Sequence, residues 1–309
     1  MSLMALTVRK KRFVRRLLGY ATNPAAVKAR TLLNREQTHD IGGVRITLPP
    51  DHSLPFYQRR DPTYDAYAVA LLRRLSGGER LTVIDVGANV GDTAAAVLAA
   101  DPATEVISVE GNEDFLGYLR RNLAAYSERA TVVAGFVGPV GERVAYRTQG
   151  STGGFQPAVA EESDTQVQEW VSPAQLLQMV GQEDRVVWKS DIDGFDIHVL
   201  AEHWNVIDER CEAIWFEFDS PRTLGDRADV ARLIELIAAS GRTCWVYDNL
   251  GRRMVVLAPG EGQATALSAL SEWLHEQIEG HITVPYLDVW AFRSDSAGRL
   301  GAETADLKT

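Results

Sequence analysis

The sequence predicts an α/β fold in which helices cover both faces of a mostly parallel sheet. Short apolar segments rich in β-branched residues alternate with helical segments over residues 61–293. The first of these apolar segments stops at a turn bounded by glycines, and several later ones end in acids. We therefore expect one α/β domain over 61–293, with an N-terminal extension over 1–60 and a polar tail over 294–309.

The N-terminal extension carries two predicted elements. Residues 9–18 hold six basic residues, and their apolar residues fall on one helical face, so a basic amphipathic helix is expected. Such a helix can contact an anionic membrane, but docking on its own protein is the expected outcome. Residues 44–48 predict a short strand, and the proline-rich connection from there to Arg60 predicts a linker or a flap.

The most informative segment follows an amphipathic helix that ends at Leu75, before two glycines. Residues 81–86 form an almost unbroken apolar run, which suits a strand buried on both faces of a parallel sheet. Gly87 and Gly91 then allow a sharp turn and the close approach of a ligand. A helix is expected over 92–100, so the unit is a strand, a glycine turn and a helix.

The spacing and charge of this turn indicate which ligand it binds. A dinucleotide-binding turn has the pattern G-x-G-x-x-G and a phosphate loop has G-x-x-x-x-G-K-[ST], whereas this turn is Gly87-Ala-Asn-Val-Gly91 with no lysine following. Asp85 ends the strand and Asp92 opens the helix, so two carboxylates would repel a pyrophosphate. The same acids attract S-adenosylmethionine, which carries a sulfonium and an ammonium and no phosphate.

The second strand, over 105–110, ends in Glu110. In nucleoside-binding α/β folds an acid at this place holds the ribose hydroxyls, although a terminal acid can also cap the helix that starts near Asn112. A helix over 115–126 and a third strand over 130–134 follow. Phe136 comes next, where its ring can stack on an adenine or belong to the core.

The remaining segments continue the alternation. Residues 144–171 contain strand-like pieces around a glycine-rich loop at 150–154, which can close over a substrate or simply connect. The later elements are a helix over 172–180, strands over 185–190 and 213–219, a helix over 227–240, strands over 243–247 and 254–257, a helix over 264–278 and a last strand over 289–292. The polar residues from Ser294 onward predict a disordered tail.

Three segments together resemble the FkbM-type methyltransferases, a class I family that depends on S-adenosylmethionine. They are Val83-Ile-Asp-Val-Gly-Ala-Asn-Val-Gly91, Val109-Glu-Gly-Asn112 and Trp188-Lys-Ser-Asp-Ile-Asp-Gly-Phe-Asp196. The resemblance implies a class I methyltransferase Rossmann-like fold with a mostly parallel seven-stranded sheet. It also implies that the turn holds the methionine part of the cofactor and that the acid of the second segment holds the ribose. The implied cofactor-binding residues are Asp85, Gly87, Ala88, Asn89, Gly91, Glu110, Gly111 and Asn112, to which Phe136 is added as the adenine contact.

The third segment departs from the family pattern, which is K-[IV]-D-[VI]-E-G-x-E. Asp193 and Asp196 stand where the family has glutamates, and Ser190 stands where it has an apolar residue. The cofactor assignment is unaffected. The acceptor side is affected, because each aspartate is one methylene shorter than a glutamate.

Methyl transfer to oxygen needs the donor and the acceptor aligned at about 3 Å and a group that takes the acceptor proton. Asp191 is the first candidate for that role and Asp193 the second, with Lys189 as an electrostatic aid. The competing interpretation is that Asp193 only caps the following helix and that Lys189 only pairs with an acid. His198 and His203 could also supply a base, although lone helical histidines are more often structural.

A metal is not expected. Asp191, Asp193, Glu217 and Asp219 form an oxygen-rich set that suits Mg²⁺, and alternation places the last two on one face of their strand. The same carboxylates can instead bind hydroxyl groups, and no cluster of cysteine and histidine supports zinc.

Composition limits the function classes. Of the 309 residues, 45% are hydrophobic and 24% are charged, which is typical of a soluble globular enzyme. The net charge of −10 argues against nucleic acid as a partner and against broad binding to anionic membranes. Cys211 and Cys244 are the only cysteines and lie in apolar contexts, as expected for reduced core residues of a cytoplasmic protein. No apolar run is long enough to span a membrane.

The sequence thus predicts an S-adenosylmethionine-dependent O-methyltransferase acting on a hydroxyl of a small molecule, a sugar or natural-product scaffold. A nucleotide-dependent oxidoreductase is the first alternative, disfavoured by the absent third glycine and by Asp85. A cofactor-binding protein without catalysis is the second, kept open by the aspartates of the third segment. The sequence makes no prediction of oligomeric state.

Overall fold

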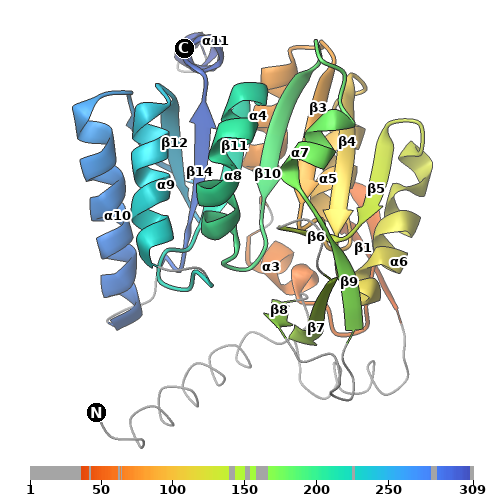
Figure 1. The fold of residues 1–309 in the computed structure, drawn as a ribbon. Coiled ribbons are helices and arrows are strands. Elements are labelled where there is room, and N and C mark those ends of the chain that lie inside the picture. The colour runs from red at the N-terminus through yellow and green to blue at the C-terminus, as the bar shows by residue number, and fades with distance from the viewer. Residues whose placement is uncertain are drawn as a thin grey trace, which may run out of the picture.

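An eight-stranded sheet forms the centre of the molecule (Figure 1). The computed structural model describes residues 36–306 except 42, 62, 64, 139–142, 150–153, 158–165, 225–226 and 280–283. The basic helix predicted over 9–18 lies outside these residues, as does all but the last residue of the loop predicted at 150–154.

The sheet has the strand order β13-β12-β14-β11-β10-β3-β4-β5. From β5 to β11 neighbouring strands are parallel, whereas β14 runs antiparallel between β11 and β12, and β13 returns along β12 at the edge. The strands are β3 (Leu81–Val86), β4 (Thr104–Glu110), β5 (Ala130–Ala134), β10 (Arg185–Ser190), β11 (Ala213–Phe218), β12 (Thr243–Asp248), β13 (Arg253–Leu257) and β14 (Leu287–Phe292). This is the predicted Rossmann-like fold with a mostly parallel sheet, and β13 is an eighth strand beyond the seven expected.

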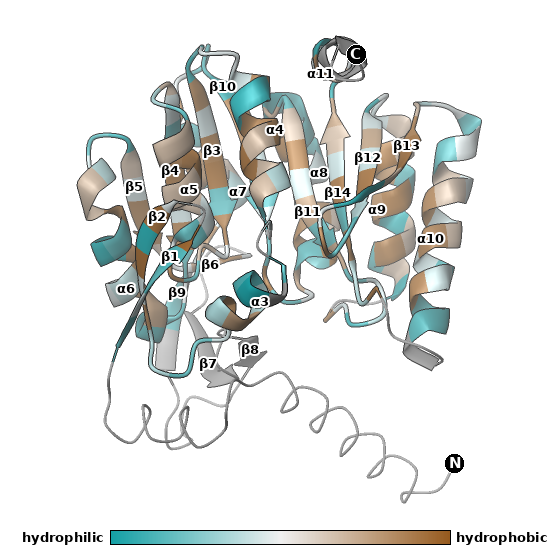
Figure 2. Cartoon of the chain, turned by 180° about the vertical axis from the view of Figure 1, so that it is seen from behind, coloured by the Kyte–Doolittle hydropathy of each residue, from teal (hydrophilic) through white to brown (hydrophobic). Residues whose placement is uncertain are grey.

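Two layers of helices cover the sheet and divide the core. The helices α4 (Ala66–Ser76), α5 (Asp92–Ala100) and α6 (Glu113–Leu123) pack on one face, and α7 (Pro173–Gln178), α8 (Asp196–Arg210), α9 (Arg227–Ala239) and α10 (Glu261–Glu279) pack on the other. Along β3, Leu81 and Val83 point to the first layer while Ile84 and Val86 point to the second. The strand is therefore buried on both faces, as its apolar run predicts. Figure 2 shows the same hydrophobic character in the other central strands.

Smaller elements lie at the carboxyl ends of the parallel strands, the lower end in Figure 1. A four-stranded sheet has the order β6-β9-β7-β8, formed by β6 (Phe136–Val137), β7 (Arg143–Gln149), β8 (Gly154–Pro157) and β9 (Gln166–Val171). Of these, β7, β8 and β9 correspond to the strand-like pieces predicted over 144–171. Helix α3 (Leu54–Arg60) lies at the same end and occupies the segment that was predicted to be a linker or flap.

The extension packs on the α/β domain. The predicted strand β2 (Val44–Leu48) pairs antiparallel with β1 (Gln37–Ile41), which the sequence analysis missed. Asn122 on α6 exchanges two hydrogen bonds with the backbone of Thr47, with N to O distances of 2.9 Å. The hairpin is therefore fixed to the helical layer that covers β3 and β4.

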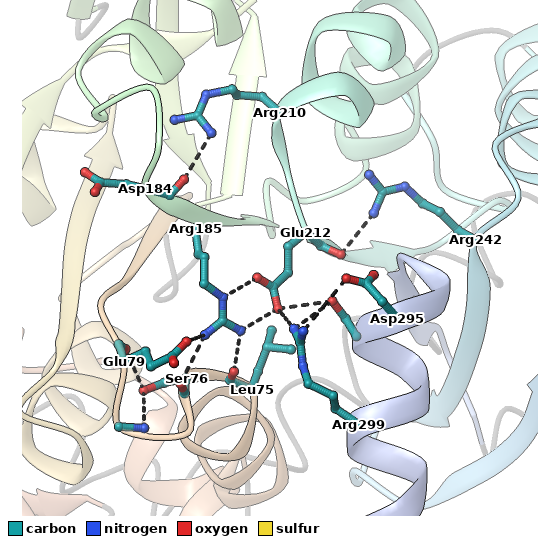
Figure 3. A network of polar contacts seen from close by, with 12 residues as sticks. Leu75, Ser76, Glu79, Asp184, Arg185, Arg210, Glu212, Arg242, Asp295 and Arg299 are labelled. Atoms are coloured by element: carbon teal, nitrogen blue, oxygen red, sulfur yellow. Dashed lines mark hydrogen bonds and ion pairs between the residues drawn. The ribbon is translucent and has the colours of Figure 1, made fainter.

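The segment predicted as a disordered tail is instead helix α11 (Ser294–Asp306). The helix is polar on average, but one side of it packs on the protein, and Ser296 and Leu300 on that side are almost fully buried. Glu212 accepts hydrogen bonds from Ser296 and Arg299 of this helix and from Arg185 at the start of β10 (Figure 3). This network holds α11 against the amino ends of the strands, away from the small four-stranded sheet. Among the described helices, none has both the length and the apolar character needed to cross a membrane.

Candidate active site

The order in which strands join the sheet switches from one side to the other between the neighbouring strands β3 and β10. From β3 the chain proceeds outward to β4 and β5, and it later returns to β10 and proceeds to β11 on the opposite side. In open α/β sheets, ligands bind in the crevice outside the carboxyl ends of the strands at such a point. The glycine turn follows β3 and the third predicted segment follows β10, so the fold brings both to one crevice.

Gly87 and Asp191 meet at this crevice. The Asp191 N–H donates to the Val86 carbonyl at 3.1 Å, and a Cβ on Gly87 would lie 1.9 Å from the Asp191 carbonyl oxygen. A Cβ on Gly91 would lie 2.6 Å from the Leu119 side chain, and both glycines have positive φ. Packing between protein segments therefore requires these glycines, in addition to the ligand access that the sequence predicts.

The turn uses all of its backbone N–H groups within the protein. The acceptors are the Val109 carbonyl for Gly87 and Ala88 at 3.0 Å, Glu110 Oε2 for Asn89 at 2.8 Å, Asn89 Oδ1 for Val90 at 2.8 Å and the Ala88 carbonyl for Gly91 at 2.8 Å. A phosphate-binding turn instead directs its N–H groups toward the ligand. This geometry agrees with the prediction that the turn does not bind a pyrophosphate.

Glu110 ends β4 beside the turn. Its carboxylate oxygens accept the N–H groups of Asn89 at 2.8 Å and Asn112 at 2.7 Å. Each oxygen retains a second lone pair, which can accept a hydroxyl. Burial raises the pKa of Glu110 to about 7, despite those two N–H groups. The cap of α6 is Asn112, whose side chain accepts the Asp114 N–H at 3.0 Å, so Glu110 is not the cap.

A cleft opens beside Glu110. Five of the predicted cofactor residues line it, namely Gly87, Asn89, Glu110, Gly111 and Phe136. Three more, Ala88, Gly91 and Asn112, are buried in the surrounding backbone and shape the turn and the helix start. All three predicted segments therefore contribute to the lining of the cleft, and Asp191 and Asp193 come from the third.

Aromatic rings form one wall of the cleft. Phe136 covers Gly111, where a Cβ would lie 2.3 Å from the ring, and its centroid lies 6.2 Å from that of Trp170. Trp170 stacks on Phe195 at 6.2 Å with an interplanar angle of 24°. Phe136 thus faces the cleft, whereas the sequence also allowed a core position. The sequence analysis missed Trp170 and Phe195, because they come from β9 and the start of α8, and only tertiary packing brings them to Phe136.

Asp85 is neutralised by Lys189. The Lys189 Nζ lies 2.6 Å from Asp85 Oδ1, and both side chains are almost fully buried. Lys189 therefore pairs with an acid, which is one part of the competing interpretation. The pair also changes the role predicted for Asp85, because a carboxylate held in this pair stabilises the lysine first and acts on a ligand only through the pair.

A second, smaller hollow adjoins the cleft on the side of α4 and shares Asp191 with it. Its walls carry acids, aromatic rings and Lys189. The lining side chains include Asp65, Tyr67, Asp191, Trp215, Glu217, Tyr286 and Asp288. The sequence analysis singled out Asp191, Lys189 and Glu217 as candidates for the chemistry. The other side chains come from the start of α4, from β11 and from the start of β14, and only the tertiary structure brings them to the turn.

The pKa values of several acids in the second hollow are raised. Burial raises the pKa of Asp288 to about 7, and burial together with Asp191 raises the pKa of Glu217 well above its usual range. Burial and the carboxylates of Asp92 and Asp288 do the same for Asp65. The hollow is therefore a place where a hydroxyl or a cation would be bound by several oxygens at once.

Hydrogen bonds within the third segment account for two of its departures from the family pattern, Ser190 and Asp196. Ser190 donates its hydroxyl to Asp196 Oδ1 at 2.6 Å, and the Ile192 N–H lies 3.2 Å from both Asp196 oxygens. Asp196 is the first residue of α8, whose N-cap is Phe195, so Asp193 does not cap this helix. Asp193 keeps exposed surface at the cleft, yet the surrounding protein and Asp191 raise its pKa to about 6.

Two of the other predicted groups, His198 and Asp219, make contacts with charged side chains. His198 Nδ1 lies 2.9 Å from Asp229, and Asp219 accepts from Arg222 at 2.5 Å. His203 is partly buried on α8, and burial lowers its pKa. Within the described part of the chain, no group of three or more histidines, cysteines and acids has the arrangement of a metal site.

Backbone strain also marks this crevice. Among the described residues, the non-glycine residues with positive φ are Asp65 at 59°, Asn89 at 50° and Asp193 at 53°. Each lines one of the two hollows. Such conformations cost about 1 kcal/mol or more and cluster at functional sites. Because such strain follows from tertiary packing, the sequence did not predict a positive φ at Asp65.

Comparisons with known proteins concern the fold. No family model matches the sequence, and no curated protein is similar to it at a significant level. A precorrin-6y C5,15-methyltransferase from Geobacter metallireducens is 17% identical with a TM-score of 0.37, covering 74% of this chain and 88% of its own. A putative O-methyltransferase from Klebsiella pneumoniae is 14% identical and an O-methyltransferase from Bacillus cereus is 12% identical, each with a TM-score of 0.41 over 74% of this chain and 80% of the other. At this level of similarity, the function is inferred from the residues of the chain itself.

Proposed function

We propose that the chain is an S-adenosylmethionine-dependent O-methyltransferase of the FkbM type, which methylates a hydroxyl of a sugar or natural-product scaffold. The observation that carries the proposal is the meeting of two hollows at Asp191, at the switch point of the sheet. One hollow suits a nucleoside, and the other suits a polar acceptor. The overall acidity of the chain is consistent with a small-molecule acceptor and not with nucleic acid.

The residues that line the cleft suit the chemistry of the cofactor. Glu110 would accept the ribose hydroxyls, the turn at Gly87 and Asn89 would contact the methionine part, and Phe136 with Trp170 would flank the adenine. When bound, S-adenosylmethionine supplies a methyl group activated by its sulfonium. The protein contributes a turn without free N–H groups for phosphate and an acidic surrounding for a cation.

Asp191 would orient the acceptor. Its side chain is exposed and lines both hollows, so an acceptor in the second hollow would meet the cleft beside this carboxylate. Asp191 would accept the proton from the acceptor hydroxyl, or hold that hydroxyl in line with the methyl group. Lys189, paired with Asp85, would hold the same wall in place beside the acceptor.

A basic acceptor nitrogen is a second candidate. The second hollow carries the carboxyl groups of Asp65, Asp191, Glu217 and Asp288, whereas its lysine is already paired with Asp85. Aromatic rings and acids together favour a cation. Matched acceptor pairs that differ only in an amino or a hydroxyl group at one position separate the two candidates, with labelled methyl donor as the readout.

Cofactor binding is tested by calorimetry. The chain is expected to bind S-adenosylmethionine and not NADH, and Glu110→Ala is expected to weaken that binding by about tenfold, because two hydroxyl contacts are lost. Glu128→Ala, on the exposed surface, is the matched control. Tight binding of NADH with none of S-adenosylmethionine would overturn the proposal in favour of the oxidoreductase.

Catalysis is tested at Asp191. Asp191→Asn keeps the size of the side chain and is expected to leave the affinity for S-adenosylmethionine within a few-fold while methyl transfer falls by about 10²-fold or more. Unchanged turnover would show that Asp191 is not the group that acts on the acceptor. Binding without turnover across a broad acceptor panel would favour the non-catalytic alternative.

A further inference from the structure

His52 reaches the cofactor turn from outside the α/β domain. It lies between β2 and α3, in the N-terminal extension, and its side chain is buried with 7% of its surface exposed. Its ring packs edge-on against Phe115 of α6, with centroids 6.0 Å apart. The Nε2 atom lies 3.0 Å from Asn89 Oδ1, at the centre of the glycine turn.

The hydrogen bonds around His52 fix its tautomer. The Leu54 N–H donates to Nδ1 at 3.2 Å, so Nδ1 carries a lone pair and the ring proton resides on Nε2. The Val90 N–H donates to Asn89 Oδ1 at 2.8 Å, which identifies that atom as the amide oxygen. His52 Nε2–H therefore donates to Asn89 Oδ1. Burial lowers the pKa of His52, which keeps the ring in this neutral form.

Asn89 needs such a support because its backbone is strained. Its φ is 50°, a conformation that side chains other than glycine adopt at a cost. In that conformation its N–H donates to Glu110 and its side chain accepts from Val90, so one residue links the acid of β4 to the turn. Asn89 also lines the cleft. A small rotation of Asn89 would therefore move both the turn and the Glu110 carboxylate.

We propose that His52 is a positioning residue for the cofactor site: its Nε2–H holds the Asn89 side chain, and thereby keeps the glycine turn and Glu110 in their binding geometry. This inference rests on the proposed function and extends it to a residue that touches no ligand. It also means that residues 36–60 belong functionally to the α/β domain, because the support for the turn comes from them.

Two substitutions separate positioning from a local role in the loop. In His52→Gln, the side-chain amide nitrogen can replace Nε2 and donate to Asn89, but the acceptor for the Leu54 N–H is lost. In His52→Asn, the side-chain oxygen can replace Nδ1 and accept from Leu54, but the reach to Asn89 is lost. The two variants thus keep opposite halves of the same pair of hydrogen bonds.

The readouts are the calorimetric affinity for S-adenosylmethionine and the hydrogen exchange rate of the Val90 amide in the ligand-free protein. Positioning predicts an affinity about five- to tenfold weaker and faster Val90 exchange in His52→Asn, with both near wild type in His52→Gln. Equal losses in both variants, or a loss confined to His52→Gln, would overturn it and leave a structural role only.

The two readouts also separate this inference from the proposed function. If the wild-type protein fails to bind S-adenosylmethionine, the proposed function is wrong, but the exchange rates still decide whether His52 fixes the turn. If the wild-type protein binds and neither variant changes affinity or Val90 exchange, the function stands and the positioning role is wrong.

Discussion

Lys189 and Asp85 form an ion pair, 2.6 Å between Nζ and Oδ1, that joins two adjacent parallel strands at paired positions. Burial alone would lower the pKa of Lys189, but Asp85 and Asp191 outweigh it and raise that pKa. The other Asp85 oxygen has no hydrogen-bond partner among the described residues. The pair therefore fixes the strand ends that carry the turn and Asp191.

Breaking this pair is expected to be costly. Lys189→Met leaves a buried carboxylate without its cation and should lower the free energy of unfolding by about 3–5 kcal/mol, measured by urea denaturation. The double variant Lys189→Met/Asp85→Leu removes both charges and should recover much of that loss. If the single variant were as stable as wild type, the pair would be solvated in solution.

Gly87→Ala should destabilise the protein through the close approach of two loops. The added Cβ would lie 1.9 Å from the Asp191 carbonyl oxygen, so β3 and β10 must separate at their ends. Gly78→Ala is the matched control, because Gly78 has φ of 84° and nothing within 4 Å of the added atom. The control should cost about 1 kcal/mol for backbone strain alone, and Gly87→Ala should cost at least about 2 kcal/mol more. Equal losses would mean that the loops yield easily.

Asp196 should make stability depend on pH. Burial and Asp191 raise its pKa to about 7, against 3.8 for the usual aspartate, despite the Ser190 hydrogen bond that lowers it. Between these values the folded state holds more protons than the unfolded state, so the free energy of unfolding falls as pH rises toward 7 and is level above it.

The variant Asp196→Asn retains an oxygen that accepts from Ser190 and Ile192 but does not titrate. From pH 5 to pH 8 its free energy of unfolding should fall by roughly 2 kcal/mol less than that of the wild type. Parallel pH curves for the two proteins would mean that Asp196 is ionised throughout this range.

Glu212 should be important for stability at the end of the sheet opposite the site. It accepts from Arg185 at 2.6 Å and 2.7 Å and from Arg299 at 3.0 Å. Glu212→Gln should cost about 1–3 kcal/mol in the free energy of unfolding, because a partly buried guanidinium loses its counter-charge. Methyl donor binding should be unaffected.

The control for Glu212 is Glu105→Gln, which removes an exposed ion pair with Arg80 of similar length, 3.0 Å. It should cost less than about 1 kcal/mol, because water screens that pair. A loss equal to that of Glu212→Gln would contradict a special role for the network shown in Figure 3.

The prediction of a disordered tail was wrong for residues 294–306, because composition does not show whether a polar segment finds partners on the folded protein. Residues 294–306 are polar on average, and only the folded sheet offers Glu212 and the α4 side as partners for Ser296, Arg299 and Leu300. Helix α3 was missed for a related reason. The prolines of this segment suggested a connection, whereas Pro55 lies in the first turn of the helix, where proline is tolerated.

The sequence by itself determined the α/β alternation, the strand that ends in the glycine turn, and the acids at the strand ends, because periodicity and turn chemistry are local properties of the chain. Only the tertiary structure decided that Lys189 neutralises Asp85, that Trp170 and Phe195 wall the cleft, and that His52 supports Asn89. These contacts join residues far apart in sequence, 37 positions apart for His52 and Asn89 and 104 for Lys189 and Asp85. Their spacing carries no local signal, so they follow from the packing of the whole sheet.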